Sequence, residues 1–137
     1  MKIETITQLI LAIIQVESSG NDMAVGDNGK AYGAMQMHAI YVDDVNRISA
    51  YKYKHEDAFD RGLAIEMFFL YTKHYATEER LGREPTMEDI ARIHNGGPDG
   101  WKKESTVPYW NKILQAHSKI QPLTNKSLGA GVSTYIY

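Results

Sequence analysis

The stretch Val16-Glu17-Ser18-Ser19-Gly20 places a carboxylate and then a glycine directly after the apolar run Leu9-Ile10-Leu11-Ala12-Ile13-Ile14-Gln15. Ile10, Ile13 and Glu17 are spaced so that their side chains share one face of a helix. Thr5-Ile6-Thr7-Gln8 fits a capping box at the start of this helix, and Gly20 is a natural end. We therefore expect Glu17 to lie half buried at the edge of the core, where a carboxyl group is poorly hydrated. The alternative is a solvated carboxylate at a helix end.

Composition narrows the class of protein. The chain has 137 residues, of which 43% are hydrophobic, which is enough for one domain with a real core. Its net charge is -2, from 15 basic and 17 acidic residues, and this balance argues against a nucleic-acid binder. The absence of cysteine excludes disulfides and cysteine-ligated zinc. Because the five histidines show no metal-ligand spacing with carboxylates, we expect no metal and no cofactor.

The amino-terminal apolar segment, residues 6–16, is interrupted by Thr7, Gln8 and Gln15, and Glu4 precedes it. These polar residues are atypical of a signal peptide, and the segment is too short to span a bilayer. We therefore interpret it as a helix of the fold. We expect a protein made in the cytoplasm without a signal peptide and without membrane insertion.

The spacing of apolar and polar residues along the chain predicts a mostly α domain over residues 1–120, followed by a carboxy-terminal tail over 121–137. A Gly-, Asn- and Asp-rich stretch, about 21–34, predicts a long loop or a small irregular sheet. A second polar, glycine-rich loop is predicted over 94–100. Further helices are predicted over about 39–47, 58–77, 86–94 and 108–120, with Leu63, Met67, Leu70 and His74 on one stripe of the longest.

Four short motifs occur in a fixed order: Glu17-Ser18-Ser19-Gly20, the stretch 26–37 that ends in Met35-Gln36-Met37, His94-Asn95-Gly96-Gly97, and Tyr109. In order and spacing they resemble the soluble-type lytic transglycosylases (SLT) and the goose-type lysozymes of the lysozyme-like superfamily, over about residues 5–120. The resemblance implies a lysozyme-like single domain with a small irregular loop or sheet beside an active-site cleft. It also implies cleavage of the β-1,4 bond between N-acetylmuramic acid and N-acetylglucosamine in peptidoglycan.

The resemblance makes Glu17 the acid that protonates the leaving oxygen, a step that needs a carboxyl group still protonated near neutral pH. In a lytic transglycosylase the C6 hydroxyl of the muramic acid then attacks, so Glu17 serves as acid and then as base. Asp27 resembles an assisting goose-type aspartate, or else it is a turn residue before Asn28-Gly29. The goose-type family has a further Asp where this chain has His38, and this departure favours the transglycosylase route over hydrolysis. The alternatives are a goose-type hydrolytic lysozyme and a catalytically inactive glycan-binding module.

Three residues of the first loop region are predicted to contact substrate. Gln36 resembles the family glutamine that faces the cleft, with hydrogen bonding inside the loop as the alternative. His38 is expected beside it. Tyr32 is expected to stack on a sugar ring or to anchor the loop.

Three further residues are predicted near the acid. His94 stands where the soluble-type enzymes usually have a Tyr bonded to the catalytic Glu. We expect it neutral beside Glu17 or turned away, and a plain helix-end residue is the alternative. Asn95 is expected to hold the loop or the N-acetyl group, and Tyr109 to lie near Glu17 or to pack in the core.

The expected partners are peptidoglycan glycan strands, and the protein is expected to be a monomer that binds no nucleic acid. A small catalytic domain of this kind is typical of a phage or mobile-element product. Two ways of reaching the cell wall stay open: release as an endolysin through a holin, or action as part of a virion or secretion apparatus.

Overall fold

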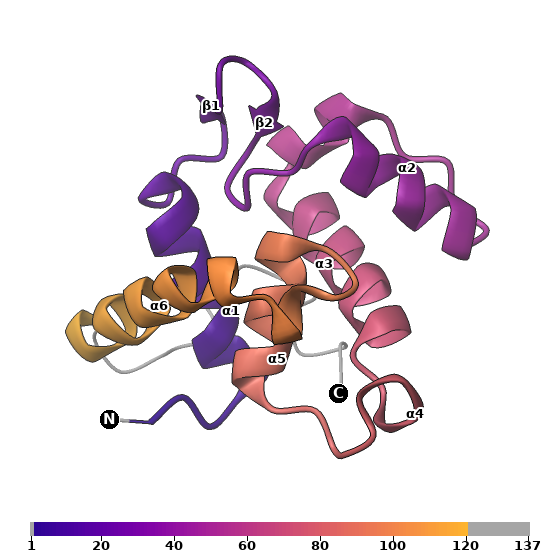
Figure 1. Cartoon of the computed structure of the whole chain (residues 1–137). Coiled ribbons are helices and arrows are strands. Elements are labelled where there is room, and N and C mark those ends of the chain that lie inside the picture. Colours follow the sequence, from indigo (N-terminus) through magenta and orange to yellow (C-terminus); the bar gives the residue numbers. More distant parts are fainter. Residues whose placement is uncertain (1, 121–137) are drawn as a thin grey trace.

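The computed structural model describes residues 2–120 of the chain (Figure 1). The predicted tail, residues 121–137, lies outside the described residues. The elements, in order, are α1 (Ile6–Ser18), β1 (Val25–Gly26), β2 (Ala31–Tyr32), α2 (Ala39–Ile48), the 3-10 helix η1 (His55–Phe59), α3 (Arg61–Tyr75), α4 (Glu78–Leu81), α5 (Met87–Gly96), the 3-10 helices η2 (Gly100–Lys102) and η3 (Glu104–Thr106), and α6 (Val107–Lys119). The prediction of a mostly helical lysozyme-like domain is confirmed in its helical content and in the small two-stranded sheet.

Helix α1 begins at the predicted capping box. Thr5 Oγ1 accepts the backbone N–H of Gln8 at 3.1 Å, and Gln8 Oε1 accepts the backbone N–H of Thr5 at 3.1 Å. The helix ends one residue earlier than the glycine implied, because Ser19 already takes a left-handed backbone (φ 54°) and Gly20 continues it (φ 83°). Glu17 is thereby fixed in the last helical turn.

The loop predicted over 21–34 contains a short antiparallel hairpin, in which Val25 pairs with Tyr32 and Gly26 with Ala31. Its turn has left-handed residues at Asp27, Asn28 and Gly29, with φ of 49°, 57° and 85°. Asp, Asn and Gly tolerate this region best, which explains the composition of the stretch. The prediction of a small irregular sheet is confirmed.

The helix predicted over 58–77 is shorter in the structure. Residues 55–59 form η1, and α3 begins at Arg61 because the Asp60 side chain accepts the backbone N–H of Leu63 at 3.0 Å and caps the helix. The predicted stripe is buried only in part, because Met67 is buried and Leu70 packs against the core, whereas His74 is exposed. Helix α3 packs against α2, η1 and α5, so it is buried on several sides. Its buried residues are Ala64, Ile65, Met67, Phe68, Phe69, Tyr71, Thr72 and Tyr75.

Helices α5 and α6 follow local signals. The capping box of Thr86 and Asp89 opens α5, close to the start of the helix predicted over about 86–94, and Pro108 lies in the first turn of α6. Helix α5 runs on to Gly96, so Asn95 belongs to its last turn and not to a loop as predicted. The loop begins at Gly97.

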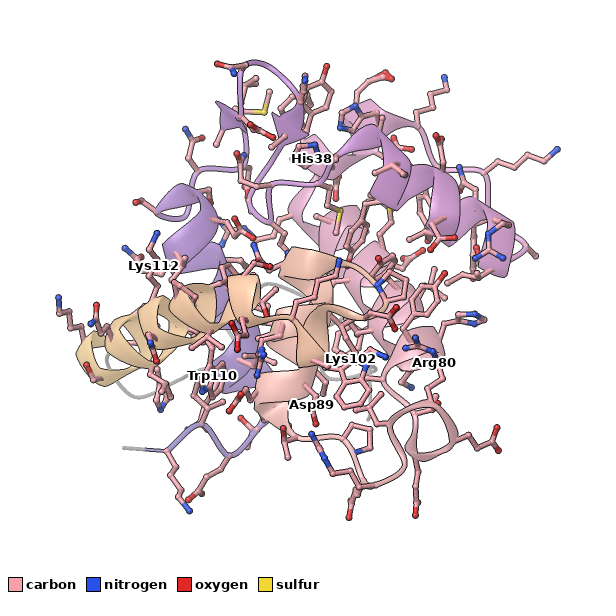
Figure 2. All side chains as sticks on the ribbon, in the orientation of Figure 1. His38, Arg80, Asp89, Lys102, Trp110 and Lys112 are labelled. Carbon is pink, nitrogen blue, oxygen red and sulfur yellow. The ribbon has the colours of Figure 1, made fainter. Side chains whose placement is uncertain are left out.

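One hydrophobic core joins these elements. Helix α1 packs on α6 and α5, and α6 crosses in front of α1 in Figure 1, with the hairpin and the start of α2 above them. Figure 2 shows His38 beside the hairpin and Asp89 on the opposite side of the molecule. Within residues 2–120, no helix is long and apolar enough to cross a membrane.

Candidate active site

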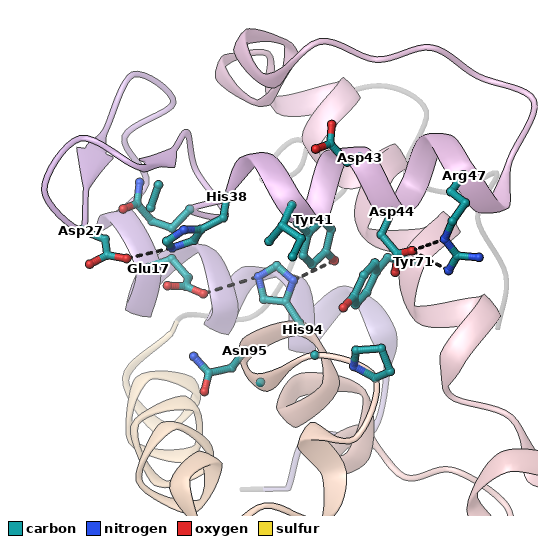
Figure 3. Close-up of a pocket in the computed structure, with 16 residues that line it drawn as sticks. Glu17, Asp27, His38, Tyr41, Asp43, Asp44, Arg47, Tyr71, His94 and Asn95 are labelled. Atoms are coloured by element: carbon teal, nitrogen blue, oxygen red, sulfur yellow. Dashed lines mark hydrogen bonds and ion pairs between the residues drawn. The ribbon is translucent and has the colours of Figure 1, made fainter.

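A cleft of about 750 Å³ opens along α2. Figure 3 shows its polar side chains in a row, from Asp27 and Glu17 at one end, past His94 and Tyr41, to Asp44 and Arg47 at the other. The lining residues come from α1, the hairpin, α2, α3, α5 and the turn after α5: Glu17, Asp27, Ala31, Gln36, His38, Ile40, Tyr41, Asp43, Asp44, Arg47, Tyr71, His94, Asn95, Gly96, Gly97 and Pro98.

Glu17 lies in this cleft with its side chain 18% exposed, so its predicted position at the edge of the core is confirmed. Its Oε2 accepts a hydrogen bond from the Tyr109 hydroxyl at 3.1 Å and lies 3.4 Å from Nε2 of His94. Among the described residues, Oε1 has no such partner. One oxygen is therefore held by the protein while the other is open to a ligand.

Tyr109 is presented by α6 and is itself buried. Burial, followed by the negative charge of Glu17, raises the pKa of the Tyr109 hydroxyl well above 10. The hydroxyl therefore stays protonated and donates to the carboxylate. The two predicted roles, core packing and proximity to the acid, are both fulfilled in position.

His94 faces Glu17 and is not turned away. Its Nε2 lies 3.1 Å from the carbonyl oxygen of Met35, and a carbonyl oxygen only accepts, so Nε2 carries the proton. Its Nδ1 lies 3.0 Å from the Tyr41 hydroxyl, which is the donor of this bond when Nε2 alone carries the ring proton. With 2% of its side chain exposed and both nitrogens engaged, His94 is fixed against Glu17.

Ser18, the residue after Glu17, ties the end of α1 to the segment after the hairpin. Its hydroxyl donates to the carbonyl oxygen of Ala34 at 2.8 Å. Because His94 holds the next carbonyl, that of Met35, two successive peptide groups are fixed beside the carboxylate. Ser18 is part of the first sequence motif, but this contact was not predicted from it.

Asp27 and His38 meet in the cleft. Nε2 of His38 lies 3.0 Å from Oδ2 of Asp27, and their side chains are 42% and 59% exposed. The alternative for Asp27, a turn residue before Asn28-Gly29, matches its backbone, which is left-handed in the hairpin turn (φ 49°), while its carboxylate pairs with His38.

Gln36 lines the cleft, but its amide also holds the loop. Nε2 donates to the carbonyl oxygens of Gly33 at 3.0 Å and Ala24 at 3.2 Å. Tyr32 is not among the lining residues. Its ring is stacked on His55, with centroids 3.6 Å apart, and on Phe59. The structure thus corrects the expectation of sugar stacking by Tyr32 and favours the loop-anchoring alternative.

Asn95 is exposed at the cleft, in the last turn of α5. Its amide has no hydrogen-bond partner within residues 2–120, so it is available to a ligand. Gly96, Gly97 and Pro98 continue this wall of the cleft with little side-chain bulk.

The far end of the cleft was missed by the sequence analysis. Arg47 bonds to Oδ1 of Asp44 through Nε (2.8 Å) and to Tyr75 (2.8 Å), and Tyr75 in turn donates to Asp44. Burial, with the charge of Asp44, raises the pKa of Tyr71 beside them. The available signal was the spacing of Ile40, Asp44 and Arg47, which places polar residues next to an exposed isoleucine on one face of the predicted helix.

No group of three or more His, Cys, Asp or Glu side chains in the described part of the chain is placed to hold a metal ion.

The chain is similar to a family of transglycosylase domains and to several lysozymes. A family model described as "Transglycosylase SLT domain" matches residues 2–78. The lysozyme of Meretrix lusoria is 49% identical over 43 residues, which cover 31% of this chain and 34% of that protein. The lysozyme of Ostrea edulis is 38% identical over 56 residues, 41% of this chain and 39% of that protein. The match therefore spans well under half the length of these curated relatives.

Solved structures share the fold over a larger part of the chain. A chain in the crystal structure of Aeromonas hydrophila PliI in complex with Meretrix lusoria lysozyme superposes with a TM-score of 0.67 and 30% identity, covering 79% of this chain and 87% of that chain. Tapes japonica lysozyme superposes with a TM-score of 0.66 and 27% identity, with the same coverage.

Proposed function

Because the chain belongs to the transglycosylase SLT domain family, we propose that it cleaves the β-1,4 bond between N-acetylmuramic acid and N-acetylglucosamine in peptidoglycan. The observation that carries this proposal is Glu17, a carboxyl group in a cleft of about 750 Å³ with one oxygen held by the protein and the other open. The lysozymes among its relatives support the same class of reaction, the cleavage of a glycosidic bond.

The chemistry follows from the two oxygens of Glu17. Protonated on its open oxygen, Glu17 donates the proton to the bridging oxygen as the bond to C1 breaks through an oxocarbenium-like transition state. The carboxylate left behind is stabilised by the Tyr109 hydroxyl and by the N–H edge of His94.

The preferred second step is that of a lytic transglycosylase. The C6 hydroxyl of the muramic acid attacks C1 and gives its proton to the Glu17 carboxylate, which yields a 1,6-anhydro end and regenerates the acid. This route needs only one carboxyl group, and Glu17 is the only acidic side chain of the described residues that contacts both Tyr109 and His94. Asn95, with its unbonded amide, is proposed to contact the substrate.

The first test is Glu17→Gln. The amide cannot donate the catalytic proton, so cleavage of purified peptidoglycan is expected to fall by at least about 100-fold. The matched control is Glu79→Gln, the same change on the exposed α4, which should leave the rate unchanged. Turbidity clearing and thermal melting are the measurements. Activity of Glu17→Gln within about threefold of the wild type, with a normal melt, would falsify the assignment.

Product analysis separates the two routes. Mass spectrometry of the released muropeptides is expected to find 1,6-anhydro ends as the main product. Reducing ends alone would favour hydrolysis, the activity that the name of the relatives suggests. Delivery to the wall through a holin, a virion or a secretion apparatus stays a prediction, tested by whether lysis of the host requires co-expression of such a partner.

A further inference from the structure

The pair formed by Asp27 and His38 is a second polar centre in the cleft, separate from the Glu17 cluster. The two side chains are joined by the 3.0 Å contact between Nε2 and Oδ2, and both line the same cleft as Glu17. Figure 3 shows them at the end of the row that holds Glu17. They come from the hairpin turn and from the residue before α2.

The contact with Asp27 fixes the tautomer of His38. An ionised carboxylate only accepts, so in the neutral ring Nε2 carries the proton and donates it to Asp27. The lone pair is then on Nδ1. That nitrogen has no hydrogen-bond partner among the described residues, and the imidazole is 42% exposed, so water from the cleft reaches it.

His94 provides an internal comparison. Both of its nitrogens are engaged, by Met35 and Tyr41, and only 2% of its side chain is exposed. His94 is therefore a positioning residue for Glu17 and cannot take a proton from a ligand without breaking its own contacts. Of the two histidines that line the cleft, His38 alone has an open basic nitrogen.

The role of His38 is not explained by helix capping. It occupies the position before α2, yet its side chain makes no capping bond.

We propose that His38, oriented by Asp27, is a general base that activates water and gives this cleft a hydrolytic route beside the transglycosylase route. In this step the water oxygen bonds to C1 while the bond from C1 to the bridging oxygen breaks. Nδ1 of His38 takes the proton from the water, and Glu17 gives its proton to the leaving oxygen. The carboxylate of Asp27 stabilises the imidazolium that results, as a carboxylate does behind a catalytic histidine. Both groups then exchange protons with solvent to restore the starting state.

This inference rests on the proposed function, and it predicts a mixture of products from the wild type. Reducing ends come from water and 1,6-anhydro ends from the C6 hydroxyl. The partition between them is set by His38, whereas total cleavage is set by Glu17. The two assignments can therefore fail separately.

The experiment measures the rates of formation of both kinds of ends by mass spectrometry. His38→Gln retains an amide donor for Asp27 but has no basic nitrogen. The reducing-end rate should fall by about 100-fold or more, and the share of reducing ends among all products should fall with it. The matched control is His74→Gln, on the exposed face of α3, which should leave both rates unchanged. Asp27→Asn should lower the reducing-end rate by at least about tenfold.

A second variant distinguishes a chemical role of His38 from a loss of folding or of local order. In His38→Ala, added imidazole should restore the share of reducing ends among the products, which no merely structural role of His38 would produce. An unchanged product ratio in His38→Gln would overturn the inference, as would a wild type that forms no reducing ends. Persistence of reducing ends in His38→Gln with their loss in Asp27→Asn would overturn it in favour of Asp27 as base. If the wild type cuts no peptidoglycan, just as Glu17→Gln is expected to cut none, the proposed function itself is refuted.

Discussion

The two carboxylate oxygens of Glu17 have different surroundings, and this asymmetry is set by residues far away in the sequence. Tyr109 and His94 both approach Oε2, from α6 and α5. An acid that must release and regain a proton needs one oxygen free for the substrate and a fixed orientation for the other. The helix end alone would provide neither, because Glu17 could then rotate in the solvent.

We expect Tyr109→Phe to lower the rate of cleavage about tenfold, because it removes one hydrogen bond to a charged group that is worth about 1.5–3 kcal/mol. The fold should persist, since the ring still fills its buried position. The raised pKa of Tyr109 means that its hydroxyl stays a donor up to at least pH 10. The kcat and the melting temperature are measured for Tyr109→Phe and for Tyr51→Phe, a control at an exposed tyrosine. An unchanged kcat would show that Tyr109 only packs.

At the level of elements, the helix starts that were predicted correctly are those set by residues close together in the sequence. Thr5 with Gln8, and Thr86 with Asp89, mark the starts of α1 and α5 because a capping box involves residues three apart. Pro108 marks the start of α6 for a similar local reason. The position of Glu17 at the core edge follows from the period of α1.

The parts that were not predicted depend on contacts between distant segments. Nothing near Tyr71 in the sequence indicates that it lines the cleft with Arg47, because α2 and α3 meet only in the folded chain. The stacking of Tyr32 on His55 is equally non-local, and it favours loop anchoring over the sugar stacking that was expected of an aromatic side chain. The pairing of Asp27 with His38 across the hairpin belongs to the same class.

The seating of the hairpin on η1 depends on Gly33. Its backbone has a φ of +82°, and an added Cβ would lie 1.8 Å from the carbonyl oxygen of Ala58. Gly33→Ala is therefore expected to lower the free energy of unfolding by about 3 kcal/mol, from the left-handed backbone and the overlap together. Urea unfolding is the measurement.

Gly29→Ala is the matched control, because Gly29 has a similar φ of +85° but nothing within 4 Å of an added Cβ. It should cost only about 1 kcal/mol, the contribution of the backbone alone. Equal losses in the two variants would mean that the contact with Ala58 is not what fixes the hairpin.

On the scale of the whole molecule, one ion pair that stabilises the fold, that of Asp89 with Arg83, does not line the cleft. Asp89 lies on the side of the molecule away from His38 (Figure 2), with its side chain 3% exposed. Its carboxylate accepts two bonds from Arg83, at 2.6 and 2.9 Å, and one from the backbone N–H of Thr86 at 2.8 Å. Burial opposes its ionisation, but these bonds prevail and hold the pKa of Asp89 below its ordinary value of 3.8.

A carboxyl group whose pKa is lower in the folded chain stabilises the fold at neutral pH, and the stabilisation is lost as pH falls through the folded value. Asp89→Asn is therefore expected to be about 2 kcal/mol less stable at pH 7. The difference should shrink as the pH falls from about 5 to about 2. Urea unfolding across this range is the measurement, and the rate of cleavage at neutral pH should be unchanged. A difference that does not vary with pH would contradict the assignment.

The bonds from Ser18 and His94 to the successive carbonyls of Ala34 and Met35 also bear on how the cleft moves. Widening the cleft at Glu17 would break both bonds together. Among the described residues, no hydrogen bond joins the second half of α2 to the turn at Gly97 and Pro98. Thermal breathing is therefore expected to pivot about the Glu17 end and to open the Arg47 end. A glycan strand can then slide in or out sideways there while the acid keeps its alignment.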